Sequence, residues 1–231
     1  MQKKYTQKFY DKYFEGSYSS AKEVINFISD FLTPKTIIDF GCGAGTWLMA
    51  SKEILSSKIL GIDQHKYSEI RMYIDEEEYI SLDLTSPIQI GEKFDLAISV
   101  EVAEHLDEKY ADIFVETLCN HSDIILFSAA VPLQGGRNHI NERPCTYWAQ
   151  KFAQKGYDLV DCVRPSIWNN DNVDAWYKNN IVLYVNREGK CLGNVPITSS
   201  PIDIIHPKLL ERIVEETIRK TKNELSKEKE E

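Results

Sequence analysis

Long apolar runs are absent from this chain of 231 residues. A membrane-spanning helix needs about 18 or more consecutive, mostly apolar residues, and a secretory signal needs a shorter apolar core behind basic residues. The chain begins with MQKKYTQK, which contains no such core. We therefore expect a cytoplasmic protein without a membrane partner.

Grouped cysteines are absent as well. No two cysteines form a C-x-x-C motif, and they are spread widely: Cys42, Cys119, Cys145, Cys162 and Cys191. Disulfide frameworks and structural zinc sites both require cysteines in regular groups. The odd number and the wide spacing argue against both, and reduced cysteines agree with a cytoplasmic location.

Positively charged residues are also few relative to negatively charged ones. Lysine and arginine number 27 against 36 aspartates and glutamates, which gives a formal net charge of −9. Because binding to phosphate backbones depends on fields of lysine and arginine, we expect no DNA partner, although a small basic patch stays compatible with this total. The apolar fraction of 42% and the charged fraction of 27% are typical of a globular protein.

Short β-branched runs alternate with helical patterns along most of the sequence. The expected strands cover residues 36–40, 58–63, 78–83, 94–100, 123–128, 158–163 and 180–185, and the expected helices cover 19–32, a segment from Gly45, 106–118 and 146–156. Strands that alternate with helices favour a parallel sheet with helices on both faces. The sequence therefore predicts an α/β fold with a seven-stranded, mostly parallel sheet.

The composition of the chain changes after residue 193. Two prolines follow, and residues 208–229 form a charged helical pattern with an apolar stripe: Leu209, Leu210, Ile213, Val214 and Ile218. We expect one domain over residues 1–193, with a helical lid over 1–33, and a charged helical tail over 194–231. The tail helix is expected to dock on the domain or to form a homodimer.

The expected first strand ends in a glycine-rich turn, IDFGCGAGTW at residues 38–47. Gly41, Gly43 and Gly45 allow a sharp turn and the close approach of a ligand to main-chain amides. Asp63 ends the next strand, where a carboxylate can accept hydrogen bonds from both hydroxyls of a ribose. A plain turn with a helix-capping aspartate is the alternative. However, glycine and acidic residues recur at successive strand ends, where ligands of open α/β sheets bind.

The spacing of this turn resembles the first motif of class I methyltransferases. The dinucleotide pattern G-x-G-x-x-G does not fit, because Thr46 stands where its third glycine would be. The resemblance implies a Rossmann-like fold with S-adenosylmethionine as cofactor. It further implies that Asp39 and the loop backbone hold the amino-acid end, that Asp63 holds the ribose, and that Asp83, with Leu84 beside it, contacts the adenine.

A wider resemblance covers roughly residues 9–187. Segments 16–21, 99–106, 127–136 and 139–144, followed by Tyr147 and Trp148, are similar to a bacterial methyltransferase family found in glycan and natural-product gene clusters. This similarity implies methyl transfer to a small-molecule acceptor such as a sugar, a glycan or a natural-product intermediate. It does not identify the acceptor.

The fourth expected strand opens into the sequence E-x-x-E-H, formed by Glu101, Glu104 and His105. This motif is similar to one that holds a divalent metal in quinone-pathway O-methyltransferases and in small-RNA 2′-O-methyltransferases. The resemblance implies a Mg²⁺ or Mn²⁺ ion that binds and acidifies an acceptor hydroxyl. The alternative is that these residues only shape the helix entry and the cleft.

His139 and Glu142 follow the fifth expected strand, in a loop that also contains Gly135 and Gly136. Histidine titrates near neutral pH and suits a general base for a hydroxyl acceptor, so we predict catalytic roles for this pair. The alternative is a histidine that orders the loop through backbone hydrogen bonds. Aromatic and amide residues at 168–180 allow either a polar-aromatic pocket or the core of a terminal hairpin.

Together, these patterns predict a methyltransferase that transfers a methyl group from S-adenosylmethionine to an oxygen of a small molecule. Three alternatives belong to other classes. They are a metal-dependent 2′-O-methyltransferase acting on RNA, a non-catalytic scaffold that binds the cofactor, and an NAD-dependent oxidoreductase. The shortened glycine turn disfavours the last of these.

Overall fold

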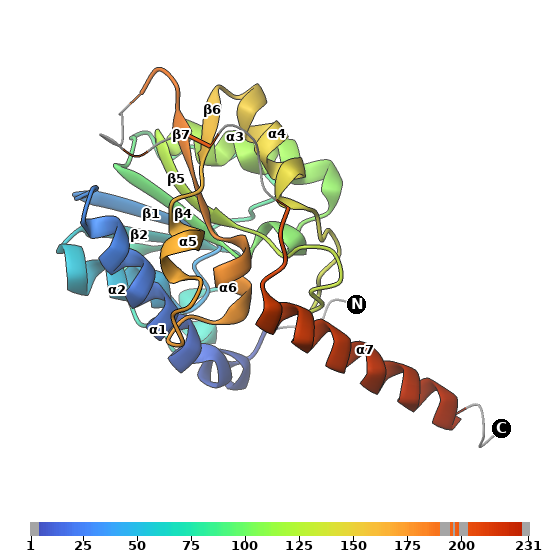
Figure 1. Ribbon diagram of the computed structural model, residues 1–231. Helices are drawn as coiled ribbons and strands as arrows, with labels where there is room; N and C mark the ends of the chain where they lie inside the picture. The colour runs from blue at the N-terminus through green and yellow to red at the C-terminus, as the bar shows by residue number, and fades with distance from the viewer. Residues whose placement is uncertain (1–4, 190–194, 196, 199–202, 228–231) are drawn as a thin grey trace.

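The computed structural model describes residues 5–189, 195, 197–198 and 203–227. In this part of the chain, a seven-stranded sheet lies between two layers of helices (Figure 1). The strands are β1 (Thr36–Phe40), β2 (Lys58–Asp63), β3 (Tyr79–Ser81), β4 (Leu96–Val100), β5 (Ile124–Ser128), β6 (Tyr157–Val160) and β7 (Val182–Asn186). Their order is β3-β2-β1-β4-β5-β7-β6, and only β7 runs antiparallel to its neighbours. The predicted seven-stranded, mostly parallel sheet is confirmed.

The helices divide between the two faces of the sheet. One layer holds α1 (Gln7–Ser29), α2 (Thr46–Leu55), α5 (Val163–Ile167) and α6 (Ala175–Asn180), and the other holds α3 (Ala111–His121) and α4 (Cys145–Gln154). The last helix, α7 (Pro207–Lys227), contacts α6 near its start and then projects away from the body (Figure 1). None of the described helices combines the length and the apolar character that a membrane crossing needs.

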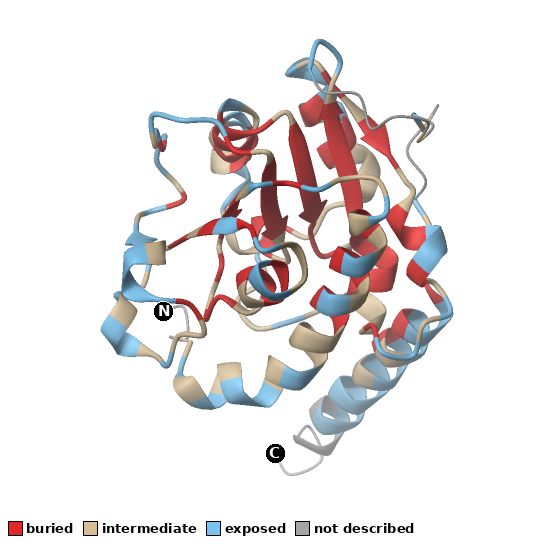
Figure 2. Ribbon diagram, turned by 90° about the vertical axis from the view of Figure 1, so that its left-hand side faces the viewer, coloured by how far each residue is buried: buried red, intermediate tan, exposed pale blue. Residues whose placement is uncertain are grey.

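Alternating strand residues supply the two cores. In β1, Ile37 packs into the core on the α1–α2 face and Ile38 into the core on the α3–α4 face. In β5, Leu126 and Phe127 divide in the same way. Successive side chains of a strand point to opposite faces, so continuous apolar runs are what a sheet covered on both sides requires. Figure 2 shows the central strands buried and the exposed residues on the outer helices.

The N-terminal helix is longer than predicted. The sequence favours a start near residue 19, but α1 begins at Gln7. Gly16 weakens a helix interior, and the structure shows its local reason: an added Cβ would lie 2.4 Å from the Asp174 carboxylate. The extra turns place aromatic side chains over the carboxyl ends of the strands. The proposed lid therefore includes a helical part that the apolar pattern alone does not reveal.

Other differences are confined to element boundaries and short helices. The helix expected over 106–118 begins at Ala111, after two 3₁₀ turns, η3 (Ala103–His105) and η4 (Glu108–Tyr110). The short helices α5 and α6 occupy a region for which no helix is predicted. The tail helix is confirmed over residues 208–227, whereas residues 228 and 229 lie outside the described part. The proposed boundary at residue 193 also lies there and stays a prediction.

Candidate functional site

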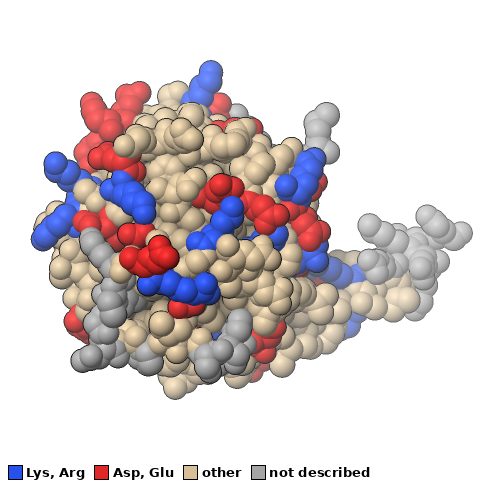
Figure 3. All heavy atoms as spheres, turned by 90° about the horizontal axis from the view of Figure 1, so that it is seen from above, with Lys and Arg blue, Asp and Glu red and all other residues tan. Residues whose placement is uncertain are grey.

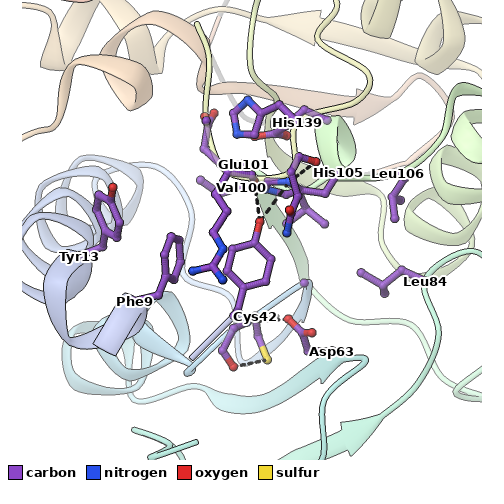
Figure 4. A pocket seen from close by; sticks show the side chains of 18 of the residues that line it. Phe9, Tyr13, Cys42, Asp63, Leu84, Val100, Glu101, His105, Leu106 and His139 are labelled. Carbon is purple, nitrogen blue, oxygen red and sulfur yellow. Dashed lines mark hydrogen bonds and ion pairs between the residues drawn. The ribbon is translucent and has the colours of Figure 1, made fainter. Parts of the chain in front are cut away.

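A cavity of about 530 Å³ opens where β1, β2 and β4 end. Ligands of open α/β sheets bind at this edge, outside the carboxyl ends of the strands. Figure 4 shows Phe9 and Tyr13 of α1 on one side of the cavity and Leu84 and Leu106 on the other. The floor is formed by the loop after β1. The volume lies in the range of small-molecule and cofactor sites.

The glycine loop makes a cradle that side chains would obstruct. Gly41 has φ 87° and Gly43 has φ 54°, both in the left-handed region that favours glycine. An added Cβ on Gly41 would lie 2.4 Å from the Val102 side chain, and one on Gly43 would lie 3.0 Å from the Tyr10 ring. The loop therefore keeps this conformation and its packing against Val102 and Tyr10 only because these positions lack a side chain, and its residues line the cavity.

Asp63 is tied to this loop. Its Oδ2 accepts a hydrogen bond of 2.9 Å from the backbone N–H of Gly43, and its Oδ1 accepts one of 2.7 Å from the N–H of Gln64. His65 Nδ1 lies 3.1 Å from Oδ1. The ends of β1 and β2 are thus held in register by one carboxylate, which also lines the cavity.

The four other predicted cofactor residues lie in two different places. Asp83 and Leu84 line the cavity beyond β3, where Asp83 Oδ1 accepts hydrogen bonds from the backbone and hydroxyl of Thr85. Asp39 ends up beneath the loop, only 3% exposed, and Gly45 caps α2; neither is among the described lining residues. Burial, together with the nearby Asp63, raises the pKa of Asp39 well above its ordinary value.

The E-x-x-E-H motif divides between two environments. Glu104 and His105 form a cluster with His139, and one ligand atom from each lies within 4.8 Å of the other two. Glu101 belongs to a different arrangement. Sequence reasoning predicts Glu101 as the third ligand and assigns His139 only to catalysis. The geometry brings His139 to the cluster instead.

Glu104 is a buried carboxyl with unfilled hydrogen-bonding capacity. It is fully buried, and neither of its carboxylate oxygens has a hydrogen-bond partner in the described part of the chain. His139 Nε2 lies 3.9 Å from Oε1. Burial raises the pKa of Glu104 well above its ordinary value, and Glu101 adds to the effect. Such a group needs a compensating cation or proton. Its donor set of carboxylate and imidazole suits Mn²⁺ or Mg²⁺.

Glu101 is held by side-chain donors. Its carboxylate accepts hydrogen bonds from Ser128 Oγ at 2.8 Å, from Gln134 Nε2 at 2.7 Å and from Asn180 Nδ2 at 3.0 Å. Its own backbone lies in the left-handed region, with φ 56°. A non-glycine residue in this conformation is uncommon and is stabilised here by the surrounding network. Three donors leave this carboxylate less free to coordinate an ion than Glu104.

His105 is a neutral imidazole at physiological pH. Burial lowers its pKa to about 4, and the adjacent His139 adds to this effect, while the Asn138 carbonyl opposes it. Its Nδ1 lies 3.3 Å from both that carbonyl and the Tyr5 hydroxyl. The His105 and His139 rings meet edge to face, with centroids 4.8 Å apart. A neutral imidazole is the form that binds metals.

His139 is oriented by Glu142. Its Nδ1 lies 2.9 Å from Glu142 Oε1, and Glu142 also accepts hydrogen bonds from the backbone N–H groups of Gly135 and Leu133. Burial alone would raise the pKa of Glu142, but these hydrogen bonds outweigh it and lower the pKa. His139 lines the cavity, whereas Glu142 lies behind it, outside the described lining. The carboxylate therefore fixes the imidazole, with Nδ1 as the donor and Nε2 left for the cavity side.

Sequence reasoning misses the aromatic side of the cavity. The lining includes side chains from the first turns of α1, from α6 and from α7: Phe9, Tyr10, Tyr13, Phe14, Trp176, Tyr177 and Arg212. The spacing in the sequence could have indicated this aromatic wall. Phe9 and Tyr13 are four residues apart, as are Tyr10 and Phe14, so each pair lies on one face of a helix. For residues 168–180 both alternatives are correct in part: Trp176 lines the cavity and also packs against the core, but it lies on a helix rather than in a hairpin.

Sequence comparisons give no match for this chain. No protein-family model matches it, and no curated protein sequence matches it. The likeness to a family of glycan and natural-product gene clusters therefore stays a prediction.

Comparison with solved structures shows the fold. An O-methyltransferase family protein from Burkholderia thailandensis is 11% identical, with a TM-score of 0.55 over 79% of this chain and 60% of that one. Magnesium protoporphyrin IX methyltransferase from Synechocystis PCC 6803, solved with bound S-adenosylmethionine, is 16% identical, with a TM-score of 0.52 over 74% and 80%. The methyltransferase domain of bacterial CtHen1-C is 16% identical, with a TM-score of 0.51 over 73% and 98%. The chain thus spans 60% of the first structure and nearly all of the third, and it has the Rossmann-like class I methyltransferase fold.

Proposed function

We propose that this protein is an S-adenosylmethionine-dependent methyltransferase. The observation that carries the proposal is the cavity at the ends of β1 and β2, where Gly41 and Gly43 form a tight turn with no room for side chains and Asp63 is fixed against this turn. Solved structures with the same fold include a methyltransferase with this cofactor bound. The cofactor supplies an electrophilic methyl group on a sulfonium, and the protein must align the acceptor, exclude water and remove one proton.

Each part of the cofactor has candidate partners. Asp63 would accept hydrogen bonds from the ribose hydroxyls, and Leu84, beside Asp83, would pack on the adenine, since all three residues line the cavity. The loop backbone would hold the amino-acid end of the cofactor, and the ligand ammonium would favour the ionised form of Asp39, which is buried beneath this loop and does not itself line the cavity. The aromatic side chains of α1 cover the cavity and exclude water.

The acceptor atom is proposed to be a hydroxyl oxygen of a small molecule. An alcohol does not lose its proton unaided at neutral pH, and the cavity presents His139, held by Glu142, beside the buried Glu104. Nε2 of His139 is the free nitrogen of the pair. The support for a small acceptor is the cavity itself, because one volume of about 530 Å³ must hold both the cofactor and the acceptor.

A divalent cation is proposed at Glu104, His105 and His139. The orphaned carboxylate of Glu104 and the neutral His105 fit this role. When bound, Mg²⁺ or Mn²⁺ would acidify an acceptor hydroxyl. His139 then serves as a ligand through Nε2, and the same lone pair is no longer available as a base. Metal ligation and general-base catalysis by His139 are therefore alternatives, which a single experiment separates.

The test has two parts. Calorimetry should show that the wild-type protein binds S-adenosylmethionine and its demethylated product, and absence of binding would overturn the proposal. Turnover is then measured with chelator and with added Mn²⁺ or Mg²⁺. Loss on chelation with recovery on readdition shows that a metal is required and supports ligation by His139, whereas activity unaffected by chelator leaves Nε2 of His139 free to act as the base.

An acceptor site on RNA is the second candidate. The observation that favours it is the cluster of Glu104, His105 and His139, because the E-x-x-E-H motif resembles that of small-RNA 2′-O-methyltransferases. Against it stands the charge, since basic and acidic side chains are interspersed on the face shown in Figure 3 and the net charge is −9. This function would be established if the protein methylated an RNA with a free 2′-hydroxyl and did not methylate the same RNA with that hydroxyl already methylated.

A further inference from the structure

The tail helix contributes a cation to the wall of the cavity. Arg212 lies in the second turn of α7 and is among the residues that line the cavity. Its guanidinium Cζ lies 4.9 Å from the centroid of the Trp176 ring, a cation–π arrangement. The helix expected only to dock or to dimerise therefore reaches the proposed active site.

Most of the hydrogen-bonding capacity of Arg212 is unused. A guanidinium has five N–H donors, and Arg212 donates only from Nε, to Glu216 Oε1 at 3.3 Å, among the residues that the structure describes. Burial raises the pKa of Asp174, and the positive charge of Arg212 opposes this shift. Stacking on Trp176 and the bond to Glu216 fix the plane of the guanidinium and leave its terminal nitrogens available to a ligand.

Ring contacts connect Arg212 to the glycine loop. Trp176 packs against Tyr177 with centroids 5.6 Å apart, and Tyr177 packs against Trp47 at 5.3 Å. Trp47 is the second residue of α2 and follows the glycine loop directly. These rings all line the cavity, so they form a continuous wall from the glycine loop to Arg212.

We propose that Arg212 forms a subsite for an oxyanion, a carboxylate or a phosphate, of the ligand bound in this cavity. A planar, always-charged fork matches the two oxygens of such a group. The anion comes either from the amino-acid carboxylate of the cofactor or from an anionic group on the acceptor. This inference rests on the proposed function, and it makes α7 part of the binding site.

The experiment compares two cofactor analogues. S-adenosylhomocysteine carries the carboxylate, whereas 5′-methylthioadenosine lacks the amino-acid carboxylate and amine. Affinities are measured by calorimetry for the wild type, for Arg212→Gln and for Arg212→Lys. If Arg212 binds the cofactor carboxylate, Arg212→Gln weakens S-adenosylhomocysteine by about tenfold or more and leaves methylthioadenosine unchanged, and Arg212→Lys restores part of the loss. The control is Arg219→Gln, an exposed arginine of the same helix.

A second arm tests the acceptor as the source of the anion. Inorganic phosphate is titrated into the protein saturated with S-adenosylhomocysteine, and into the free protein. Phosphate binding to the saturated protein that is lost in Arg212→Gln assigns the subsite to the acceptor. If neither the analogue ratio nor phosphate binding changes in Arg212→Gln, the proposal is overturned. Failure of the wild type to bind S-adenosylhomocysteine would instead count against the proposed function, and phosphate binding to the free protein would still test Arg212.

Discussion

The carboxyl group of Asp39 is buried at the end of β1, 3% exposed and close to a second carboxylate, Asp63. Without a ligand, this arrangement disfavours the ionised form. A cationic amino group bound beside it would reverse the effect. The ionised form of Asp39 therefore favours ligand binding but lowers the stability of the ligand-free protein.

We expect Asp39→Asn to stabilise the ligand-free protein at pH 7. The raised pKa means that the folded state keeps a proton that the unfolded chain releases above its ordinary value of 3.8, so wild-type stability falls as the pH rises through this window. An amide cannot ionise, so the variant loses this part of the pH dependence and gains about 0.5–2 kcal/mol at pH 7. Urea unfolding at pH 5 and pH 7 measures both effects, with the exposed Asp83→Asn as control. A less stable variant at pH 7 would contradict the argument.

His139 and Glu142 have separate tasks at the same site. We expect His139→Ala to lower turnover by about 10²- to 10⁴-fold, because it removes the free imidazole nitrogen, and to leave the affinity for S-adenosylhomocysteine nearly unchanged. Glu142→Gln should cost less, since an amide oxygen still accepts from Nδ1. Steady-state kinetics and calorimetry check the two variants. A parallel loss of cofactor affinity in His139→Ala would show that this residue supports the cofactor instead.

The loop after β5 positions His139 through a glycine. At Gly136, an added Cβ would lie 2.2 Å from His139 Nε2, so the imidazole occupies the space that a side chain would need. Gly136 is not among the glycines with positive φ, and alanine there is therefore compatible with the backbone. The effect of a substitution is confined to the contact with the ring.

We accordingly expect Gly136→Ala to displace His139 and to reduce Mn²⁺ affinity and turnover by about tenfold or more, with cofactor affinity retained. The matched control is a double-mutant cycle with His139→Ala. If the steric contact is the cause, Gly136→Ala adds no further loss in the His139→Ala background. Additive losses would mean that the substitution disturbs the whole loop.

Elements with strong local patterns were predictable from the sequence. The strands β1, β2 and β5 are apolar runs of five or six residues bounded by glycine, proline or polar residues, and their positions agree with the prediction almost residue for residue. The start of α1 was not predictable in the same way. Tyr10 in its first turns packs beside Gly43, and Tyr5, just before the helix, packs against His105. Both partners come from distant loops, so local apolar spacing does not indicate where the helix starts.

The residues of the site likewise divide into those that local sequence predicts and those that depend on contacts between distant segments. The glycine loop and Asp63 are local to two strand ends, and the structure places them together in the cavity. The meeting of His139 with Glu104 depends on a tertiary contact, because the backbone N–H groups of Ile140 and Asn141 bond to the Glu104 carbonyl at 2.9 and 3.0 Å. No spacing along the sequence encodes that contact. The spacing also does not reveal that the side chains of Gln134 and Asn180 donate hydrogen bonds to the Glu101 carboxylate.

At the scale of the whole molecule, α7 leaves an apolar stripe uncovered. Leu209 and Ile213 are buried against the body, but Leu210, Val214, Ile218 and Leu225 are each about half exposed, at 47% to 53%. They recur at helical spacing along the part of α7 that projects from the body (Figure 1). The charges are asymmetric, since Glu215 and Glu216 precede Ile218 and Arg219 and Lys220 follow it. An antiparallel partner of the same sequence would place acidic residues opposite basic ones.

We therefore expect a weak, concentration-dependent homodimer in which two copies of α7 pair antiparallel about Ile218. Ile218→Lys should abolish it, because it places like charges at the centre of the pair. Light scattering over a range of concentrations measures the mass. Orientation is tested by charge reversal at Glu216 and Lys220, which face each other when the pair is centred on Ile218: Glu216→Lys and Lys220→Glu each weaken the dimer, and the double variant, with unchanged composition, recovers it. A parallel pair predicts no such recovery, since each position would then face its own copy. A monomer at every concentration would leave the stripe without this partner and overturn the prediction.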